Sequence, residues 1–423
     1  MLLRSTRSVC PVCLQPLPAA LIQREEGVYM EKECPEHGFF SAPVWHNRVN
    51  RAFYANRIPP LGEKEGLRCP AACGICREHK SGTCCALLEI TNRCNLRCRF
   101  CFAEGGAKNE REKSTEELEL AIACLLELGH RPTLQLSGGE PTLREDLPEL
   151  IQFAKSLGAP FIQLNTNGIR LAEEPGYAAA LKEAGLSYVF LQFDGTEEEI
   201  YRRLRGRPLL AVKEKTIESC AACRLGVALV PTVVRGVNAH NLGDIVRFGL
   251  AHAPAVRGVH FQPVSYFGRC PGERPERYTL DDLIADVAEQ TGIPAERFTP
   301  SHCDHPLCGF HLGGMVLPDG RFLPLGRETD RGKTDAAQNR DYVGRHWVRP
   351  NTDAETTALF SRDGSFDLEA FAARAESHSF TLTAMAFQDA GNLDIERLRH
   401  CSLHVWKNNR LMPFCAAYLS PLT

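Results

Sequence analysis

The middle of the chain alternates short apolar runs with longer amphipathic stretches. The apolar runs are five to seven residues long, a length typical of buried strands. They lie at residues 86–91, 133–137, 161–165, 188–193, 228–234 and 258–263. Amphipathic stretches such as 115–128 and 146–157 predict helices between them. Strands that alternate with helices about every 30 residues predict parallel βαβ units and an α/β fold.

Residues capable of ligand binding follow the ends of four predicted strands. They are the three cysteines Cys94, Cys98 and Cys101, then Gly138-Gly139-Glu140, then Asn165 to Gly168, and finally Asp194. In barrels of parallel strands the active residues lie at the carboxyl ends of the strands. We therefore expect these four groups to meet at one end of the sheet.

The flanking segments differ in pattern from this central region. Around a Glu-Gly turn near residue 27, short apolar runs predict a hairpin. After the core, a helix is predicted at 280–290 and a turn at Pro318-Asp319-Gly320. We divide the chain into a small module at 1–60, a cysteine-rich segment at 61–85, an α/β core at 86–275 and a C-terminal α+β domain at 276–423.

Composition and charge exclude several classes of protein. Of the 423 residues, 43% are hydrophobic and 24% are charged, as in soluble globular proteins. The net charge of −3 gives no argument for binding to nucleic acid or to an acidic membrane. No stretch reaches the roughly 18 apolar residues of a membrane-spanning helix, and the N-terminus lacks the apolar run of a signal peptide. We expect a cytoplasmic protein, peripheral to the membrane only if its substrate is a lipid.

Cysteine is the residue type that departs most from an ordinary composition. The chain has 19 cysteines and no secretory signal, so metal ligation explains them better than disulfides do. The C-x3-C-x2-C spacing of Cys94, Cys98 and Cys101 can hold three corners of a [4Fe–4S] cube and leave the fourth iron open to a small molecule. Farther along the chain, Glu140 can accept hydrogen bonds from the ammonium group of such a molecule.

A second group of ligands lies in the N-terminal module. Twenty residues separate Cys10 and Cys13 from Cys34, and His37 follows shortly afterwards. Two ligand-bearing turns joined by a hairpin are typical of zinc ribbons and rubredoxins. These four residues predict a tetrahedral site for one mononuclear zinc or iron ion. In the alternative interpretation, Cys34 is simply buried and His37 is a loop residue.

Two further groups of cysteines predict auxiliary [4Fe–4S] centres. The first comprises Cys69, Cys73, Cys76 and Cys84, with Cys85 as the alternative fourth ligand. The second comprises Cys303, Cys308, Cys401 and Cys415, with His305 as an alternative ligand. A structural zinc ion is the alternative occupant of both sites. A cluster closed by four thiolates cannot chelate a small molecule. We therefore expect a small molecule to bind at the open iron of the central triad alone.

The central triad, the aromatic Phe100 before its last cysteine and the downstream Gly-Gly-Glu together resemble the radical S-adenosylmethionine (SAM) superfamily. Nearly the whole chain resembles a multi-cluster branch that includes the archaeal tetraether-lipid synthase and the 7,8-dihydro-6-hydroxymethylpterin dimethyltransferase. The similar segments are 10–13, 34–38, 69–76, 191–195, 230–234, 303–308 and 413–415. The resemblance implies a partial (β/α)6 TIM-like barrel, a rubredoxin-like or zinc-ribbon-like module, one SAM cluster and two auxiliary clusters.

The resemblance also implies roles for single residues and a source of electrons. The cluster ligands are Cys94, Cys98 and Cys101, and the methionine part of SAM is bound by Gly138, Gly139 and Glu140. The adenosine part is contacted by the Phe100 backbone and by Asn165, Asn167 and Asp194. A low-potential carrier such as ferredoxin or flavodoxin supplies the electrons.

Three functions agree with these residues. The main hypothesis is a C–C bond-forming enzyme that couples lipid chains at an unactivated carbon, which predicts a long apolar channel. The alternative is radical methylation of a pterin-type small molecule, which predicts a compact polar pocket, and peptide modification is its variant. The third is a non-catalytic iron–sulfur redox protein, which predicts reversible reduction without SAM binding.

Overall fold

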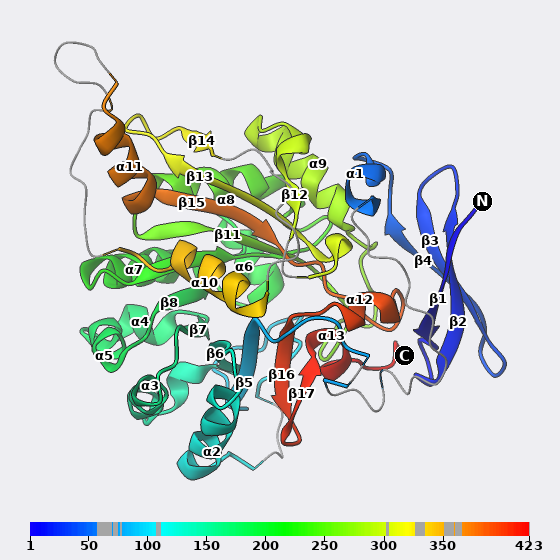
Figure 1. The fold of residues 1–423 in the computed structure, drawn as a ribbon, viewed down its shortest axis with the longest axis horizontal. Helices are drawn as coiled ribbons and strands as arrows, with labels where there is room; N and C mark the ends of the chain where they lie inside the picture. Colours follow the sequence, from blue (N-terminus) through cyan, green and yellow to red (C-terminus); the bar gives the residue numbers. More distant parts are fainter. Residues whose placement is uncertain are drawn as a thin grey trace.

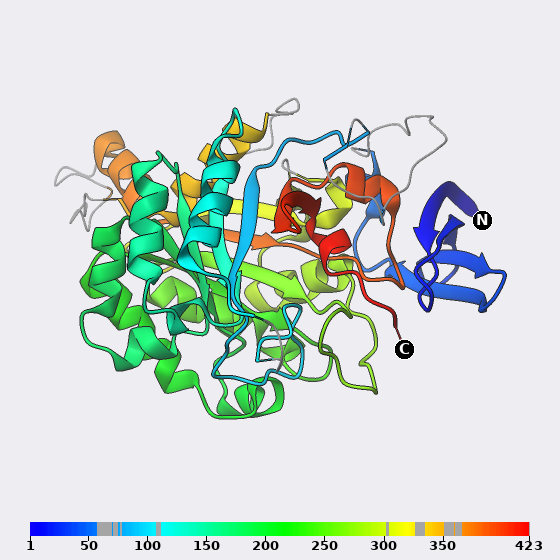
Figure 2. The same cartoon turned by 90° about the horizontal axis from the view of Figure 1, so that it is seen from below.

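The computed structural model describes residues 1–56, 70, 75–76, 78–106, 111–301, 304–325, 335–350, 359 and 366–422. Within these residues the strands form two sheets, a four-stranded sheet at the N-terminus and a thirteen-stranded sheet that includes all the others (Figure 1). The larger sheet curls into an open barrel with helices on its outer face (Figure 2).

Six parallel strands follow one another through the middle of the larger sheet. They are β5 (Cys85–Thr91), β6 (Thr133–Gly138), β7 (Ile162–Thr166), β8 (Tyr188–Gln192), β9 (Gly226–Val230) and β11 (Val256–Pro263). Each is parallel to its neighbour, and β10 (Thr232–Val233) pairs with the end of β11. The parallel α/β core predicted from the sequence is therefore confirmed.

Helices connect these strands on the outer side of the barrel. They are α2 (Thr115–Leu126), α3 (Leu147–Ser156), α4 (Ile169–Glu173), α5 (Tyr177–Ala184), α6 (Glu198–Arg205), α7 (Leu210–Ala222) and α8 (Leu242–Ala251). The first of them begins at a capping box, in which the Ser114 and Glu117 side chains each bond the other residue's backbone N–H. Such a box satisfies amide groups that a helix end leaves without partners.

Alternation along the strands separates a packed outer face from a polar inner face. In β6, Leu134 and Leu136 are fully buried in the main hydrophobic core, whereas Gln135 and Ser137 line the interior of the barrel. Successive side chains of a strand point to opposite faces of its sheet, so the helices cover the leucine side only. The interior is left with side chains that can form hydrogen bonds.

The C-terminal segment adds strands to both edges of the same sheet. β15 (Ser379–Ala384) lies parallel to β11, and β16 (Leu403–Lys407) lies parallel to β5. Among the described residues the barrel therefore has eight parallel strands, the six above plus these two. The other strands are β12 (Thr299–Pro300), β13 (Phe310–Val316), β14 (Phe322–Pro324) and β17 (Arg410–Pro413). The boundary placed near residue 275 does not separate two sheets, because a short strand carries no signal for a partner far away in the sequence.

The remaining helices lie in or next to the C-terminal segment. They are α1 (Arg51–Ala55), α9 (Leu280–Thr291), α10 (Ala336–Trp347), α11 (Leu368–Ser377), α12 (Ile395–Arg399) and α13 (Phe414–Ala417). Between β16 and β17 the chain turns through Asn408 and Asn409, whose φ angles of 52° and 57° suit a tight hairpin. No helix in the described part of the chain is long and apolar enough to cross a membrane.

The N-terminal sheet is antiparallel and packs beside the C-terminal segment (Figure 1). Its strands are β1 (Leu2–Val9), β2 (Pro16–Gln23), β3 (Val28–Cys34) and β4 (Gly38–Trp45). The side chains of Arg4 and Thr6 donate hydrogen bonds to Asp394, at the start of α12. Buried Lys32 donates to the Ala390 carbonyl oxygen at 2.6 Å. These contacts fix the module against the barrel domain.

Candidate active site and metal centres

The barrel encloses a cavity of about 1030 Å³. Cys94, Cys98 and Cys101 line one end of it, together with the Gly138-Gly139-Glu140 segment. The inner faces of β6 to β11 contribute the amide side chains of Gln135, Gln163, Asn165, Gln192 and Gln262. The structure thus brings together most of the residues that follow the predicted strands.

Close backbone contact explains why glycine occupies positions 138 and 139. A Cβ atom on Gly138, whose φ is +121°, would lie 2.3 Å from the Thr91 carbonyl oxygen. On Gly139 it would lie 2.1 Å from the Arg93 carbonyl oxygen. Only glycine tolerates such an approach. The amides of Gly139 and Glu140 then donate to Thr91 and Arg93, so this segment braces the cysteine loop from behind.

Glu140 connects the loops that follow β6 and β7. Its carboxylate is 1% exposed and accepts hydrogen bonds from the hydroxyl groups of Thr142 and Thr166, both at 2.7 Å. It also accepts from the backbone amide of Asn167, again at 2.7 Å. A carboxylate accepts strong charge-assisted bonds of this kind. Protein groups already engage both oxygens, so the first role of Glu140 is to hold these loops in register.

The asparagines after β7 reach toward the cysteine loop. The Asn167 side chain donates to Oδ1 of Asn95 at 2.7 Å, next to the ligand Cys94. Asn165 accepts a hydrogen bond from Gln163 at 2.6 Å, and both asparagines line the cavity. Phe100 also borders the cavity while its ring packs in a small apolar cluster. Asn95 carries no motif signal and was missed in the sequence.

Asp194 follows β8, as the sequence predicted, and its side chain pairs with an arginine. Its side chain is fully buried, is not among the described residues that line the cavity, and forms a double hydrogen bond with Arg205 at 2.6 and 2.7 Å. The contact between Asp194 and the adenosine ribose stays a prediction. A buried carboxylate needs a charged partner, and this one has it in the protein.

Arg205 is a site residue that the sequence did not reveal. It lines the cavity, donates to the Thr232 hydroxyl at 3.0 Å and lies beside the Cys98 thiol. Burial alone would lower the pKa of Arg205, but Asp194 and Cys98 raise it above its usual range. No spacing rule links an arginine at a helix end to a cysteine loop, so only the tertiary structure shows the pair.

The central triad fits the iron–sulfur cluster that its spacing predicts. Burial, followed by the nearby Glu140 and the other two thiols, raises the pKa of Cys94 to about 11. Burial also raises the pKa of Cys101, although the cationic Arg269 opposes that shift. Thiols such as Cys94 and Cys101, which burial keeps protonated, become good ligands once a metal supplies positive charge. Arg205 and Arg269 add further positive charge at the same place.

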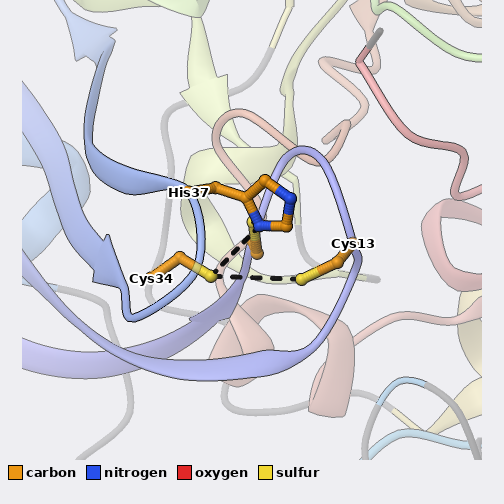
Figure 3. Close-up of side chains that lie close together, drawn as sticks. Cys13, Cys34 and His37 are labelled. Atoms are coloured by element: carbon orange, nitrogen blue, oxygen red, sulfur yellow. Dashed lines mark hydrogen bonds between the residues drawn. The ribbon is translucent and has the colours of Figure 1, made fainter.

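The N-terminal ligands converge in the described structure. The ligand atoms of Cys10, Cys13, Cys34 and His37 all lie within 4.8 Å of one another. His37 Nδ1 is 3.5 Å from Cys34 Sγ, and Cys13 Sγ is 4.0 Å from Cys34 Sγ (Figure 3). Burial would raise the pKa of Cys10, but the backbone amides of Cys13 and Val12 lower it. These distances and donors suit a tetrahedral metal ion.

The C-terminal group of cysteines is partly within the described residues. Cys303 lies outside them, whereas Cys308, Cys401 and Cys415 are described and lie close together. Burial, then Asp304, Cys415 and Cys308, raises the pKa of the Cys401 thiol. Arg397 donates two hydrogen bonds of 3.4 Å to Cys308 Sγ. This arrangement suits thiolate ligands stabilised by a cation.

The other auxiliary group cannot be assembled from the described residues. Cys69 and Cys73 lie outside them, Cys76 is exposed, and Cys84 is buried at the cavity wall. Cys85 begins β5, and burial raises its pKa well above the usual value. The assignment of Cys69, Cys73, Cys76 and Cys84 to one cluster therefore stays a prediction.

Comparison with known proteins identifies the class. The radical SAM superfamily model matches residues 88–249, and the model of the HMPTM N-terminal zinc ribbon domain matches residues 2–46. The chain is 34% identical to the 7,8-dihydro-6-hydroxymethylpterin dimethyltransferase of Methanocaldococcus jannaschii, over 97% of this chain and 92% of that protein. The chain belongs to the radical SAM superfamily. It is an enzyme of a class that uses SAM and a [4Fe–4S] cluster, as the motifs predicted.

Other similarities are confined to part of the chain. The probable GTP 3',8-cyclase of Methanothermobacter marburgensis is 29% identical over 48% of this chain and 65% of its own length. The Fe-coproporphyrin III synthase of Methanosarcina barkeri is 34% identical over 52% of this chain and 56% of that protein. Among solved structures, Streptococcus suis SuiB aligns with a TM-score of 0.43 at 16% identity, over 51% of this chain and 48% of that one.

Proposed function

We propose that this enzyme catalyses radical methylation of a pterin-type small molecule. This was the alternative reading of the sequence, behind lipid-chain coupling. The relative from Methanocaldococcus jannaschii, which matches nearly the whole chain, is named for a pterin substrate, and none of the relatives described above is named for a lipid. The observation that carries the proposal is this match over 97% of the chain, and the amide side chains on the otherwise largely apolar wall of the cavity support it.

Several amide side chains lie together on that wall. Gln135 donates to Gln163 at 3.3 Å, and Gln163 donates to Asn165 at 2.6 Å, so the three form a chain across β6 and β7. The Gln262 side chain lines the cavity and has no hydrogen-bonding partner among the described residues. A lipid chain would leave the Gln262 amide without a hydrogen-bonding partner, at a cost of about 1–3 kcal/mol. A heterocycle with N–H and C=O groups along its edges would satisfy them.

The residues of the chain then take the following roles. Cys94, Cys98 and Cys101 hold the catalytic cluster, and Glu140 with Asn167 keeps its loop in place. With a cluster bound there, these residues would support one-electron cleavage of the C5'–S bond of SAM, which gives methionine and a 5'-deoxyadenosyl radical. The backbones of Gly138, Gly139 and Phe100, with Asn165, hold SAM at the cavity wall. The barrel encloses the substrate and excludes water, which protects reactive species from side reactions.

Two auxiliary clusters and one mononuclear ion complete the proposal. The sets are Cys69, Cys73, Cys76 and Cys84 for one cluster, Cys303, Cys308, Cys401 and Cys415 for the other, and Cys10, Cys13, Cys34 and His37 for the ion. The match to a zinc-ribbon model favours zinc over iron at the last site. The electrons come from a low-potential carrier such as ferredoxin or flavodoxin.

The test is substrate-dependent cleavage of SAM by anaerobically reconstituted enzyme. We expect 6-hydroxymethyl pterins to stimulate formation of 5'-deoxyadenosine and to gain mass in steps of one methyl group, whereas detergent-solubilised lipids do neither. Gln262→Leu should lower kcat/KM for the pterin about 10- to 100-fold, as expected for loss of a buried hydrogen bond, while SAM binding is kept. Gln152→Leu, on the exposed face of α3, is the matched control. If lipids stimulated the formation of 5'-deoxyadenosine and pterins did not, the result would contradict this proposal and favour lipid-chain coupling.

A further inference from the structure

The loop that carries the catalytic cysteines also carries exposed arginines. Arg97 and Arg99 are exposed and alternate with Cys98 and Cys101, which face the cavity. The backbone amide of Arg99 donates to the Leu204 carbonyl oxygen at 2.9 Å, which joins this loop to the end of α6. Arg202, Arg203 and Arg207, at and after that helix end, are exposed as well. We call Arg97, Arg99, Arg202, Arg203 and Arg207 the arginine surface.

The charge of this surface is not neutralised within the described chain. Four of its members, Arg97, Arg99, Arg202 and Arg207, form no ion pair with the described residues. Arg203 donates to the carbonyl oxygen of Gly236, which leaves its charge in place. Arg99 and Arg203 border a hollow of about 170 Å³ with Arg235, Arg274 and a single acidic residue, Glu273. In a chain of net charge −3, five exposed arginines in two adjoining segments are a marked local asymmetry.

We propose that the arginine surface is the docking site for an acidic one-electron carrier protein. Carrier and cluster exchange a single electron: the carrier is oxidised by one electron, the cluster on Cys94, Cys98 and Cys101 is reduced by one, and no atom is transferred. Arg99 directly follows Cys98, and only Phe100 separates it from Cys101, so a carrier bound here lies directly outside the cluster loop. Complementary charge mainly increases the rate and selectivity of such encounters. The inference rests on the proposed placement of the catalytic cluster.

A purely structural role makes a different prediction. Arg202 and Arg203 lie in the last turn of α6, where positive charge stabilises a helix through its dipole. If that were their whole role, their removal would lower the free energy of unfolding and leave carrier binding unchanged. The two roles are therefore separated by measuring stability and binding on the same variants.

The experiment compares two double variants with a matched control. Arg202→Gln/Arg207→Gln and Arg97→Gln/Arg99→Gln each remove two charges from the arginine surface. Lys155→Gln/Arg247→Gln removes two exposed charges from α3 and α8 instead. The reconstituted holoenzyme is titrated with an acidic flavodoxin, and cluster reduction is followed by stopped-flow absorbance and EPR. Dithionite serves as the small-molecule reductant in parallel.

We expect the Kd for flavodoxin to rise about five- to tenfold in each arginine variant and to stay unchanged in the control. Added salt should weaken flavodoxin binding to the unmodified enzyme more than to the variants, because screening acts on exposed charges. Reduction by dithionite should proceed at equal rates in all proteins. An unchanged Kd, an equal loss in the control, or equally slowed reduction by dithionite would each overturn the proposal. Absence of pterin methylation would leave all these readouts intact, so the two proposals fail separately.

Discussion

The carboxylate of Glu140 accepts the backbone amide of Asn167 at 2.7 Å, across the loops that follow β6 and β7. Through Asn167 this contact continues to Asn95 in the cysteine loop. Three strand ends are thus linked by one buried carboxylate. The glutamate of the Gly-Gly-Glu motif therefore shapes the SAM pocket even before any ligand is present.

Replacing Glu140 with glutamine should disturb that link. A glutamine amide presents an N–H₂ group where one carboxylate oxygen now accepts a bond, so one of the donors at Thr142, Thr166 or Asn167 loses its partner. We expect a loss of about 1–3 kcal/mol in the free energy of unfolding, together with weaker SAM binding. Chemical denaturation and calorimetric titration with SAM measure the two effects. Unchanged stability with lost SAM binding would instead show that Glu140 acts on the ligand alone.

Breaking the buried ion pair of Asp194 and Arg205 should be costly. Asp194→Asn leaves the guanidinium of Arg205 buried without a counter-charge, and we expect a loss of about 3–5 kcal/mol. Denaturant unfolding of the apoprotein provides the measurement, with the half-exposed Asp244→Asn, whose ion pair with Arg247 is open to solvent, as control. If Asp194→Asn kept full stability and lost only SAM affinity, the original ribose-binding role would gain support.

Removing one ligand of the N-terminal centre should release its metal without affecting the barrel clusters. Cys13→Ser is expected to lose one bound zinc or iron per chain and to lower Tm, because the module has little hydrophobic core of its own around Cys10, Leu17 and Cys34. Elemental analysis and thermal unfolding test this expectation. The EPR signal of the SAM cluster should persist, and its loss would contradict the assignment of separate sites.

The contact between His46 and Asp282 should make docking of the N-terminal module depend on pH. Their side chains are 2.8 Å apart, and the hydrogen bond with Asp282 raises the pKa of His46 in the folded state. A group whose pKa is raised on folding stabilises fully below its unfolded pKa and loses that contribution as the pH rises through the folded value. We therefore expect the free energy of unfolding of the native protein to fall as the pH rises above about 6.5. The fall should be smaller in His46→Gln. If the free energy of unfolding changed with pH equally in both proteins, His46 would not be the cause of the pH dependence.

Local patterns predicted the parallel core because each βαβ unit is built from neighbouring residues. The runs at 133–137 and 188–193 were found as β6 and β8 with nearly the same ends. Spacing alone located the group of Cys10, Cys13, Cys34 and His37, because chelation restricts sequence distance. Cys69, Cys73 and Cys76 repeat the spacing of Cys94, Cys98 and Cys101, so the preceding strand and the downstream Gly-Gly-Glu motif were needed to select the latter triad. By contrast, β15 and β16 join the sheet through partners far away in the sequence, and nothing in a five- or six-residue run specifies such a partner.

The sequence by itself determined the class of chemistry, through cysteine spacing and the glycines that permit the close contact of residues 138 and 139 with the cysteine loop. Only the tertiary structure decided which side chains face the cavity, because their orientation depends on the pairing of strands that are distant in the sequence. It paired Asp194 with Arg205, and it placed Gln262 on the inner wall. It also brought Arg99 next to the end of α6, where separate segments combine into one charged surface.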